Sequence, residues 1–248
     1  MKLRLIAAIA ATFFAADLAQ AAEIKVASTQ ATEEAYKELV VQFEKATGHK
    51  VTTYFSGTLN VSKKLADGEQ YDLIIMSQSA IDEQTKLGKV VPGSRVDFAS
   101  SGTGLAVKRG APKPDISTTD ALKKTLLTAK SVGYSTGPSG VYVLSMFDKL
   151  GVGNEVKPKL KQTPSGVFVG NLIASGETEI GFQQISELVH FPGIDYVGPL
   201  PADVQRTTMF SSGIATQAKQ ADAAKALVKF LTAPAAAPVI KKHGLAPG

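Results

Sequence analysis

The sequence predicts a two-lobed α/β fold in which each lobe is an open, mostly parallel sheet flanked by helices, and two strands cross between the lobes. Two features predict it. Short apolar strand-like segments alternate with amphipathic helical segments, as in parallel sheets covered by helices. Residues 96–108 and 207–216 are extended stretches with Ser-Ser-Gly at their centres, and we expect them to be the crossing strands. Lobe A then comprises residues 23–101 and 212–248, and lobe B residues 102–211; one continuous domain is the alternative.

Lobe A begins with three strand–helix pairs. The first helix carries apolar side chains at Ala35, Leu39 and Phe43, four residues apart, and Gly48 follows it as a stop. The third strand is apolar throughout, as expected where helices cover both faces. The expected strands are 24–27, 51–55 and 73–76, and the expected helices are 31–47, 58–65 and 79–87.

Lobe B carries a second set of elements between the crossing strands. The expected strands are 132–134, 180–182 and 194–197, and the expected helices are 140–150 and 165–174. After the second crossing, helices at 218–231 and 235–243 should return to lobe A.

Residues 1–22 are expected to be a cleavable signal peptide. Lys2 and Arg4 precede an apolar run over residues 5–16, which is too short to span a bilayer. Ala-Gln-Ala at 19–21 offers the small-x-small pattern of a cleavage site. We therefore expect a secreted protein; a buried N-terminal helix is the alternative.

The composition argues against several kinds of site. The chain has no Cys, so it has neither disulfide nor thiol nucleophile. His49, His190 and His243 show no metal-ligand spacing, and we expect no metal and no cofactor. The net charge of +5 is dispersed and there is no Trp, so nucleic acid is a poorly supported partner, whereas a small anion suits the mild basicity. We expect a monomer.

Four polar loops are expected at the carboxyl ends of strands, where open α/β sheets bind ligands. Helix N-termini there add unpaired N–H groups and a partial positive charge that suits an anion. Any one of these loops is also an ordinary helix cap, but two from each lobe together predict a cleft lined by neutral donors. The loops are Ser28-Thr29-Gln30, Ser56-Gly57-Thr58, residues 135–140 and Gln183-Gln184.

Several short motifs carry a family resemblance. They are Ile-Lys-Val at 24–26, Phe-Glu-Lys-Ala-Thr-Gly at 43–48, Phe-Ser-Gly-Thr at 55–58, Pro-Ser-Gly-Val-Tyr at 138–142 and Ser-Gly-Glu at 175–177. In this order and spacing the chain resembles the ModA-like family of periplasmic solute-binding proteins, whose best-known members carry molybdate. The resemblance implies a type II periplasmic binding protein fold, a periplasmic location and an ABC permease as a possible partner.

The resemblance also implies a ligand set. In molybdate binders of this family three side-chain hydroxyls and two backbone N–H groups hold the oxyanion. Thr58 matches one hydroxyl, while Ala31 and Gln184 stand at the other two positions. A site that loses hydrogen-bond partners loses affinity, so molybdate is a poor match. The expected substrate-binding residues are Ser28, Thr29, Ser56, Gly57, Thr58, Ser139, Gly140, Val141, Val167 and Gln184.

The altered loops suit a planar carboxylate better than a compact oxyanion. Residues 180–187 and Val-Gly-Pro-Leu-Pro at 197–201 resemble the branch of the family that includes bacterial aconitate isomerases. Interconverting trans- and cis-aconitate by an allylic proton shift needs a general base and donors that stabilise charge on a carboxylate.

The sequence leaves the catalytic base open. Glu33, Glu34, Tyr142 and His190 lie near the expected loops, but each has an ordinary structural explanation. Two functions of different classes therefore remain. One is an aconitate isomerase, which is favoured because two of the three oxyanion-binding hydroxyls are replaced. The other is a receptor that delivers molybdate or another small oxyanion or carboxylate to an ABC importer.

Overall fold

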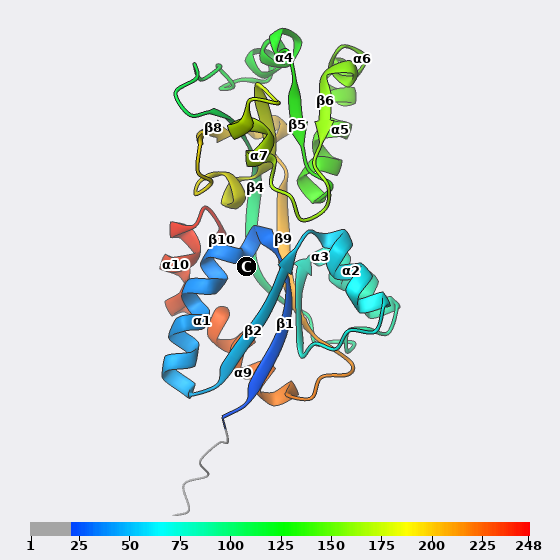
Figure 1. The fold of residues 1–248 in the computed structure, drawn as a ribbon, viewed down its shortest axis with the longest axis vertical. Helices are drawn as coiled ribbons and strands as arrows, with labels where there is room; N and C mark the ends of the chain where they lie inside the picture. Colours follow the sequence, from blue (N-terminus) through cyan, green and yellow to red (C-terminus); the bar gives the residue numbers. More distant parts are fainter. Residues whose placement is uncertain (1–20) are drawn as a thin grey trace, which may run out of the picture.

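The computed structural model describes residues 21–248, so the predicted signal peptide lies outside the described residues except for its last two. The chain forms two α/β lobes joined by the long strands β4 (Val96–Lys108) and β9 (Thr207–Ile214) (Figure 1). The two-lobed fold and both predicted crossing strands are confirmed. The predicted lobe boundaries fall inside these two strands, which run unbroken from one lobe to the other.

Lobe A is built on three parallel strands, which continue into the two crossing strands in the order β2-β1-β3-β9-β4. All five residues of β3 are buried, which explains its apolar sequence. The strands of lobe A are β1 (Glu23–Thr29), β2 (Lys50–Ser56), β3 (Leu73–Ser77) and β10 (Ala246–Pro247). Its helices are η1 (Gln30–Thr32), α1 (Glu33–Thr47), α2 (Thr58–Ala66), α3 (Gln78–Lys86), α9 (Ala221–Leu231), η4 (Pro234–Ala236) and α10 (Ala237–Lys242).

Helices cover both faces of the lobe A sheet (Figure 1). On one face, Leu39 and Phe43 of α1 pack with Leu227 of α9. On the other, Val61 of α2 and Ile81 of α3 pack against the strands. Each such buried side chain contributes about 1.5–3 kcal/mol. Within residues 21–248 no single helix is long and apolar enough to cross a membrane; α9 and the following η4–α10 segment pass that test only as a pair bent by 58°.

Lobe B has three parallel strands in the order β6-β5-β7, and β7 and β8 pair antiparallel with the second half of β4. Its strands are β5 (Val132–Tyr134), β6 (Leu160–Gln162), β7 (Ile180–Gln184) and β8 (Ile194–Pro199). Its helices are α4 (Thr119–Thr128), α5 (Pro138–Lys149), α6 (Gly153–Val156), η2 (Lys157–Lys159), α7 (Val169–Ser175), α8 (Ile185–Leu188) and η3 (Ala202–Val204).

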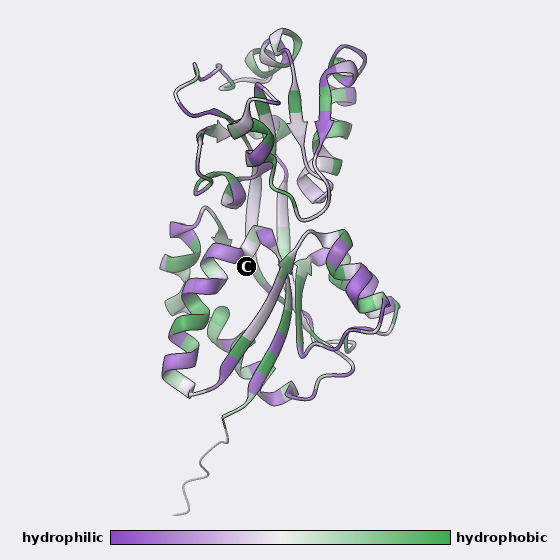
Figure 2. Cartoon of the chain, in the orientation of Figure 1, coloured by the Kyte–Doolittle hydropathy of each residue, from purple (hydrophilic) through white to green (hydrophobic). Residues whose placement is uncertain are grey.

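Each lobe has its own hydrophobic core, and the link between them is polar. Figure 2 shows both crossing strands pale where they pass between the lobes. The pale stretch of β4 contains Ser100, Ser101 and Gly102, which are small or polar. The two cores hold the sheets rigid and so fix the loops at the strand ends that face the other lobe.

The prediction from the sequence was wrong about the start of one helix and did not include some of the observed elements. The helix predicted at 165–174 begins only at Val169, because Gly166 has a φ of +83°, a left-handed conformation that a right-handed helix cannot contain. Helix α4 was missed, although the Thr118 hydroxyl caps it by accepting from the Ala121 N–H at 3.2 Å. Strand β6 has only three residues and gives no period-2 pattern to detect.

Candidate ligand-binding site between the lobes

A cavity of about 400 Å³, partly open to solvent, is lined by residues of both lobes and of one crossing strand. Lobe A contributes the loops after β1 and β2, and lobe B contributes the loops before α5 and α7 and the end of β7. The lining residues are Thr29, Gln30, Ala31, Gly57, Thr58, Ser135, Thr136, Gly137, Pro138, Ser139, Pro164, Gly166, Val167, Gln183, Gln184, Glu187 and Phe210.

Six of the ten predicted ligand residues line this one cavity, although they come from five separate segments of the chain. They are Thr29, Gly57, Thr58, Ser139, Val167 and Gln184. Segments far apart in the sequence therefore meet, as the strand-end rule predicts for open sheets.

The other four predicted residues do not line the cavity. The hydroxyls of Ser28 and Ser56 make hydrogen bonds within lobe A. Gly140 is buried so close to the Ser135 carbonyl that no side chain fits. Val141 is 66% exposed on the outside of α5. These positions support or flank the lining.

Two helices begin at the cavity without a side-chain cap. The N-cap residues of α2 and α5 are Gly57 and Gly137, and neither end has a side-chain cap hydrogen bond. Among the described helices only α4, with Thr118, has such a cap, so what distinguishes the starts of α2 and α5 is their place at the cavity. The first-turn N–H groups of α2 and α5 thus have no side-chain partner, and their partial positive charge favours an anion.

The Thr29 hydroxyl is a further free group, buried beside the cavity. Thr29 is 4% exposed, and its Oγ1 is buried without a hydrogen-bond partner among the described residues. Such a group costs about 1–3 kcal/mol when unsatisfied. A polar ligand atom in the cavity would remove that cost.

The two neighbouring glutamines are largely occupied by the framework. Gln183 Oε1 accepts from the Val169 N–H at 2.8 Å. The Gln184 amide lies with its oxygen toward Thr208, accepting from Oγ1 at 2.9 Å. Its nitrogen donates to the carbonyls of Ser101 at 3.0 Å and Gly102 at 3.2 Å. Gln184 therefore lines the cavity and at the same time ties both crossing strands to β7.

The lobes touch beside the cavity. Gln30 Nε2 donates to the Gly166 carbonyl at 3.2 Å, and Asn60 Nδ2 donates to the Ser165 carbonyl at 3.0 Å. A Cβ at Gly57 would lie 2.5 Å from Ser165 Oγ and 2.6 Å from the Gly166 nitrogen. Glycine at position 57 therefore permits the close approach of the two lobes.

Glu187 is the only ionisable side chain among the described residues that line the cavity. It lies in α8, directly after the end of β7, and is partly buried. Burial raises the pKa of its carboxyl to about 8; the Gln184 backbone and the Gln183 side chain lower it in part, and the charge of Glu33 raises it. No local pattern singles out Glu187, beyond its being an acid three positions after Gln184.

The four residues considered from sequence as possible bases lie elsewhere. Glu33, Glu34 and His190 line a neighbouring groove, to which Glu187 also contributes. The Tyr142 hydroxyl donates to a backbone carbonyl of lobe B. None of the four lines the cavity.

Two of the histidines meet across the lobes. His190 Nε2 lies 3.1 Å from His243 Nδ1, and His243 Nε2 lies 2.8 Å from Glu38 Oε2. The three groups form a chain and do not converge on one point. Within residues 21–248 no three His, Asp or Glu side chains gather in a way that could hold a metal ion.

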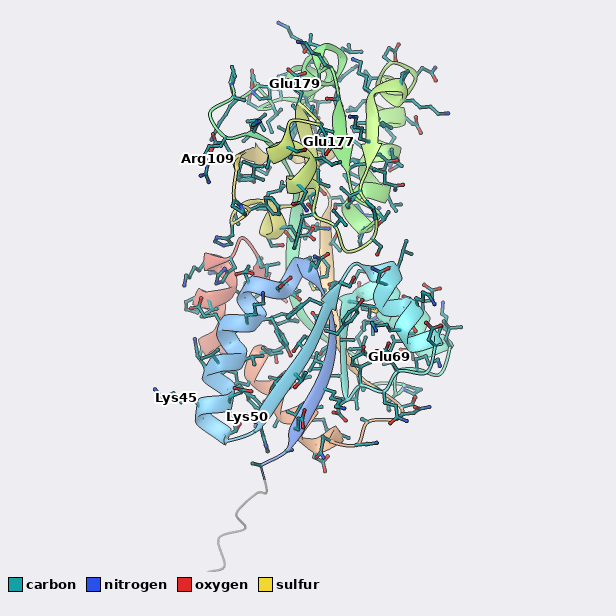
Figure 3. All side chains as sticks on the ribbon, in the orientation of Figure 1. Lys45, Lys50, Glu69, Arg109, Glu177 and Glu179 are labelled. Carbon is teal, nitrogen blue, oxygen red and sulfur yellow. The ribbon has the colours of Figure 1, made fainter. Side chains whose placement is uncertain are left out.

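Basic side chains lie away from the cavity. None of the described Lys or Arg residues lines it. Arg95 pairs with Asp82 at 2.6 Å, and the Arg206 guanidinium lies over the Tyr142 ring at 5.6 Å. Figure 3 shows the labelled charged side chains, among them Arg109, on the flanks of the lobes and not at their junction. The cavity offers an anion neutral donors and helix ends instead of cations.

Fold and site together define a two-lobed α/β protein with a polar cavity between its lobes. A family model described as bacterial extracellular solute-binding protein matches residues 24–246, and the chain belongs to this family. Its resemblance to the ModA-like proteins is thereby confirmed.

Named relatives fall into both functional classes. An aconitate isomerase of Pseudomonas sp is 38% identical over 217 residues, which cover 85% of this chain and 82% of the relative. The molybdate-binding protein ModA of Azotobacter vinelandii is 32% identical over 253 residues, which cover 97% of this chain and 96% of the relative. A solved periplasmic molybdate-binding protein of Azotobacter vinelandii superposes with a TM-score of 0.77 at 19% identity, covering 91% of this chain and 99% of that one, and shares the fold.

Proposed function

We propose that the protein is a periplasmic aconitate isomerase that interconverts trans- and cis-aconitate. The observation that carries the proposal is the composition of the cavity: hydroxyl and backbone donors surround a single carboxyl group, with no basic side chain among the described lining residues. The similarity to the Pseudomonas aconitate isomerase supports the same substrate.

The reaction moves the double bond of aconitate along an allylic system. A proton leaves the methylene carbon, and the electron pair of that C–H bond forms the new double bond. A proton joins the far carbon of the former double bond, so the composition of the substrate is unchanged. In between, negative charge spreads onto a carboxylate, and fixed N–H and O–H donors stabilise such charge. The uncapped first turns of α2 and α5 and the Thr29 hydroxyl are donors of this kind.

The closed arrangement of the lobes suits this chemistry. The contacts of Gln30 and Asn60 with the loop before α7 close one side of the cavity. A closed site excludes water, which strengthens every electrostatic interaction inside it. Opening about the crossing strands would admit substrate and release product.

A receptor function for an ABC importer is the second candidate. The similarity to ModA over nearly the whole chain favours it. Lobe closure would trap a ligand in the same way that it would exclude water from a reaction. The loss of hydroxyls at Ala31 and Gln184, and the full use of the Gln184 amide by the crossing strands, weigh against a tetrahedral oxyanion as the ligand.

The experiment is a turnover assay on the purified chain lacking residues 1–22. Protein is incubated with trans-aconitate, and both isomers are separated by chromatography over time, with calorimetric titration of molybdate in parallel. The proposal predicts cis-aconitate in amounts far above the amount of protein. A heat of binding on titration with molybdate, with no isomerisation of aconitate, would instead support a receptor that delivers its ligand to an importer.

A further inference from the structure

We propose that Glu187 is the catalytic acid–base residue that carries the proton between the two carbon atoms of the substrate, an inference that rests on the proposed isomerase function. Its position is the first argument. The reaction needs a group at the cavity surface that can take up and give back a proton, and Glu187 is the one such group among the described lining residues.

The local structure holds this carboxyl in place. Glu187 belongs to α8, which starts directly at the end of the buried strand β7 and packs against β4, β7, β8 and η1. Its carboxyl interacts with the Gln183 side chain and the Gln184 backbone. Gln183 is itself fixed by the Val169 N–H. A framework of this kind orients a carboxyl group for proton transfer.

Glu187 accepts a hydrogen bond from the Gln184 backbone and so helps to cap α8, but such a cap does not require the side chain to be buried. It forms no ion pair with any of the described residues. The nearby cation Lys37 is paired with Glu33 and Glu34 on α1. A partly buried acid without a cation, placed in a cleft, is a feature of functional sites.

The surroundings make this carboxylate a stronger base than a solvent-exposed one. Desolvation raises its pKa to about 8, the Glu33 charge acts in the same direction, and the Gln183 and Gln184 hydrogen bonds oppose it. Glu34 and His190 face the same outer groove. A base whose pKa lies near the working pH combines proton affinity with a usable fraction of carboxylate.

Glu187 lines both the cavity and the outer groove. One face of the residue is thus available to a ligand, and the other lies on the groove formed by Glu33, Glu34 and His190. The groove side connects the carboxyl group to solvent, with which it can exchange its proton.

The step balances without a cofactor. The Glu187 carboxylate takes the proton of the methylene C–H bond, and that electron pair forms the new C=C bond. The electron pair of the old C=C bond passes through the delocalised anion to the far carbon, which takes the proton from the Glu187 carboxylic acid. The carboxylate is restored, and nothing is oxidised or reduced.

The test compares Glu187→Gln with Glu34→Gln, which changes an acid of the outer groove that does not line the cavity. We measure turnover of trans-aconitate, calorimetric binding of an equilibrated isomer mixture, and the pH profile of kcat/KM. We expect Glu187→Gln to bind within about tenfold of wild type and to turn over about 10²–10⁴-fold more slowly, as general-base removal does. Glu34→Gln should match wild type. The wild-type kcat/KM should rise with pH and level above about 8.

The outcomes separate the two proposals. Turnover by wild type and by Glu187→Gln at similar rates would overturn the role of Glu187 and leave the isomerase function standing. If Glu187→Gln loses binding and turnover together, Glu187→Asp, which keeps the carboxyl group, decides: turnover clearly above that of Glu187→Gln supports the role, and turnover no better than that of Glu187→Gln overturns it. Restoration of both by an uncharged Glu187→Asn variant overturns it. No turnover by wild type would overturn both proposals at once.

Discussion

Replacing Gly57 by Ala tests whether the approach of the lobes contributes to ligand affinity. The Gly57 backbone has φ −69° and ψ 156°, which Ala adopts without strain, so the fold should be kept. Its new Cβ would lie 2.5 Å from Ser165 Oγ and 2.6 Å from the Gly166 nitrogen in the other lobe. A normal contact needs more than 3.4 Å, so the lobes must stay apart by several tenths of an ångström or more.

The expected loss follows from the contacts that such a displacement weakens. The hydrogen bonds from Gln30 to Gly166 and from Asn60 to Ser165 are worth about 0.5–1.5 kcal/mol each. Losing both costs about 1–3 kcal/mol, which corresponds to roughly a 5- to 150-fold weaker affinity. The assay is calorimetric titration with an equilibrated mixture of aconitate isomers, together with the thermal midpoint of the ligand-free protein.

The matched control is Gly198→Ala in β8. A Cβ there meets only Ile116 Cδ1 at 3.9 Å, an ordinary contact remote from the cavity lining. It should leave affinity unchanged. An affinity of Gly57→Ala equal to that of the control, with equal thermal midpoints, would refute the view that the closed arrangement contributes to binding.

Three further predictions concern single residues. Thr29→Val removes a hydroxyl that has no partner among the described residues, so the free protein should be no less stable while ligand affinity falls about 5- to 30-fold, measured by thermal unfolding and calorimetry. Asp72→Ala should lower the free energy of unfolding by about 3 kcal/mol or more, measured in urea, because the buried carboxylate accepts from three backbone N–H groups of two segments. Because burial raises the pKa of Glu187 from 4.5 to about 8, the folded state holds a proton that the unfolded state loses between these values. The stability of wild type therefore falls as pH rises through this window. Glu187→Gln lacks this titration, so its free energy of unfolding relative to wild type should rise by about 3 kcal/mol between pH 5 and pH 8. A difference between the two proteins that is the same at both pH values would contradict the raised pKa.

The fold could be predicted from the sequence because its signals are local and repeated. The apolar run at 73–76 and the spacing of Leu39 and Phe43 predict a covered strand and an amphipathic helix, and both are confirmed. The helix expected at 165–174 failed because its apolar residues did not reveal the left-handed backbone of Gly166. A Cβ at Gly166 would lie 2.6 Å from Ser56 Oγ of lobe A, and no local pattern encodes this close approach.

The site could be predicted only in part, for a related reason. The strand-end rule brings Thr29, Thr58 and Ser139 to one cavity. It does not tell which polar groups the framework has already used, as it has the Gln184 amide. Nor does it reveal Glu187, whose proximity to the cavity arises from a single turn of helix after β7 and from the packing of that turn on both lobes.

The most direct test of the central claim follows the two isomers by proton NMR with protein present at about one thousandth of the substrate. One sample starts from trans-aconitate and the other from cis-aconitate, with Glu187→Gln protein as the reference for each. We expect wild-type protein to bring both samples to the same isomer ratio, and the variant to do so at least about a hundredfold more slowly. Samples that keep their starting isomer in the presence of folded wild-type protein would contradict it and leave a protein that binds its ligand without converting it.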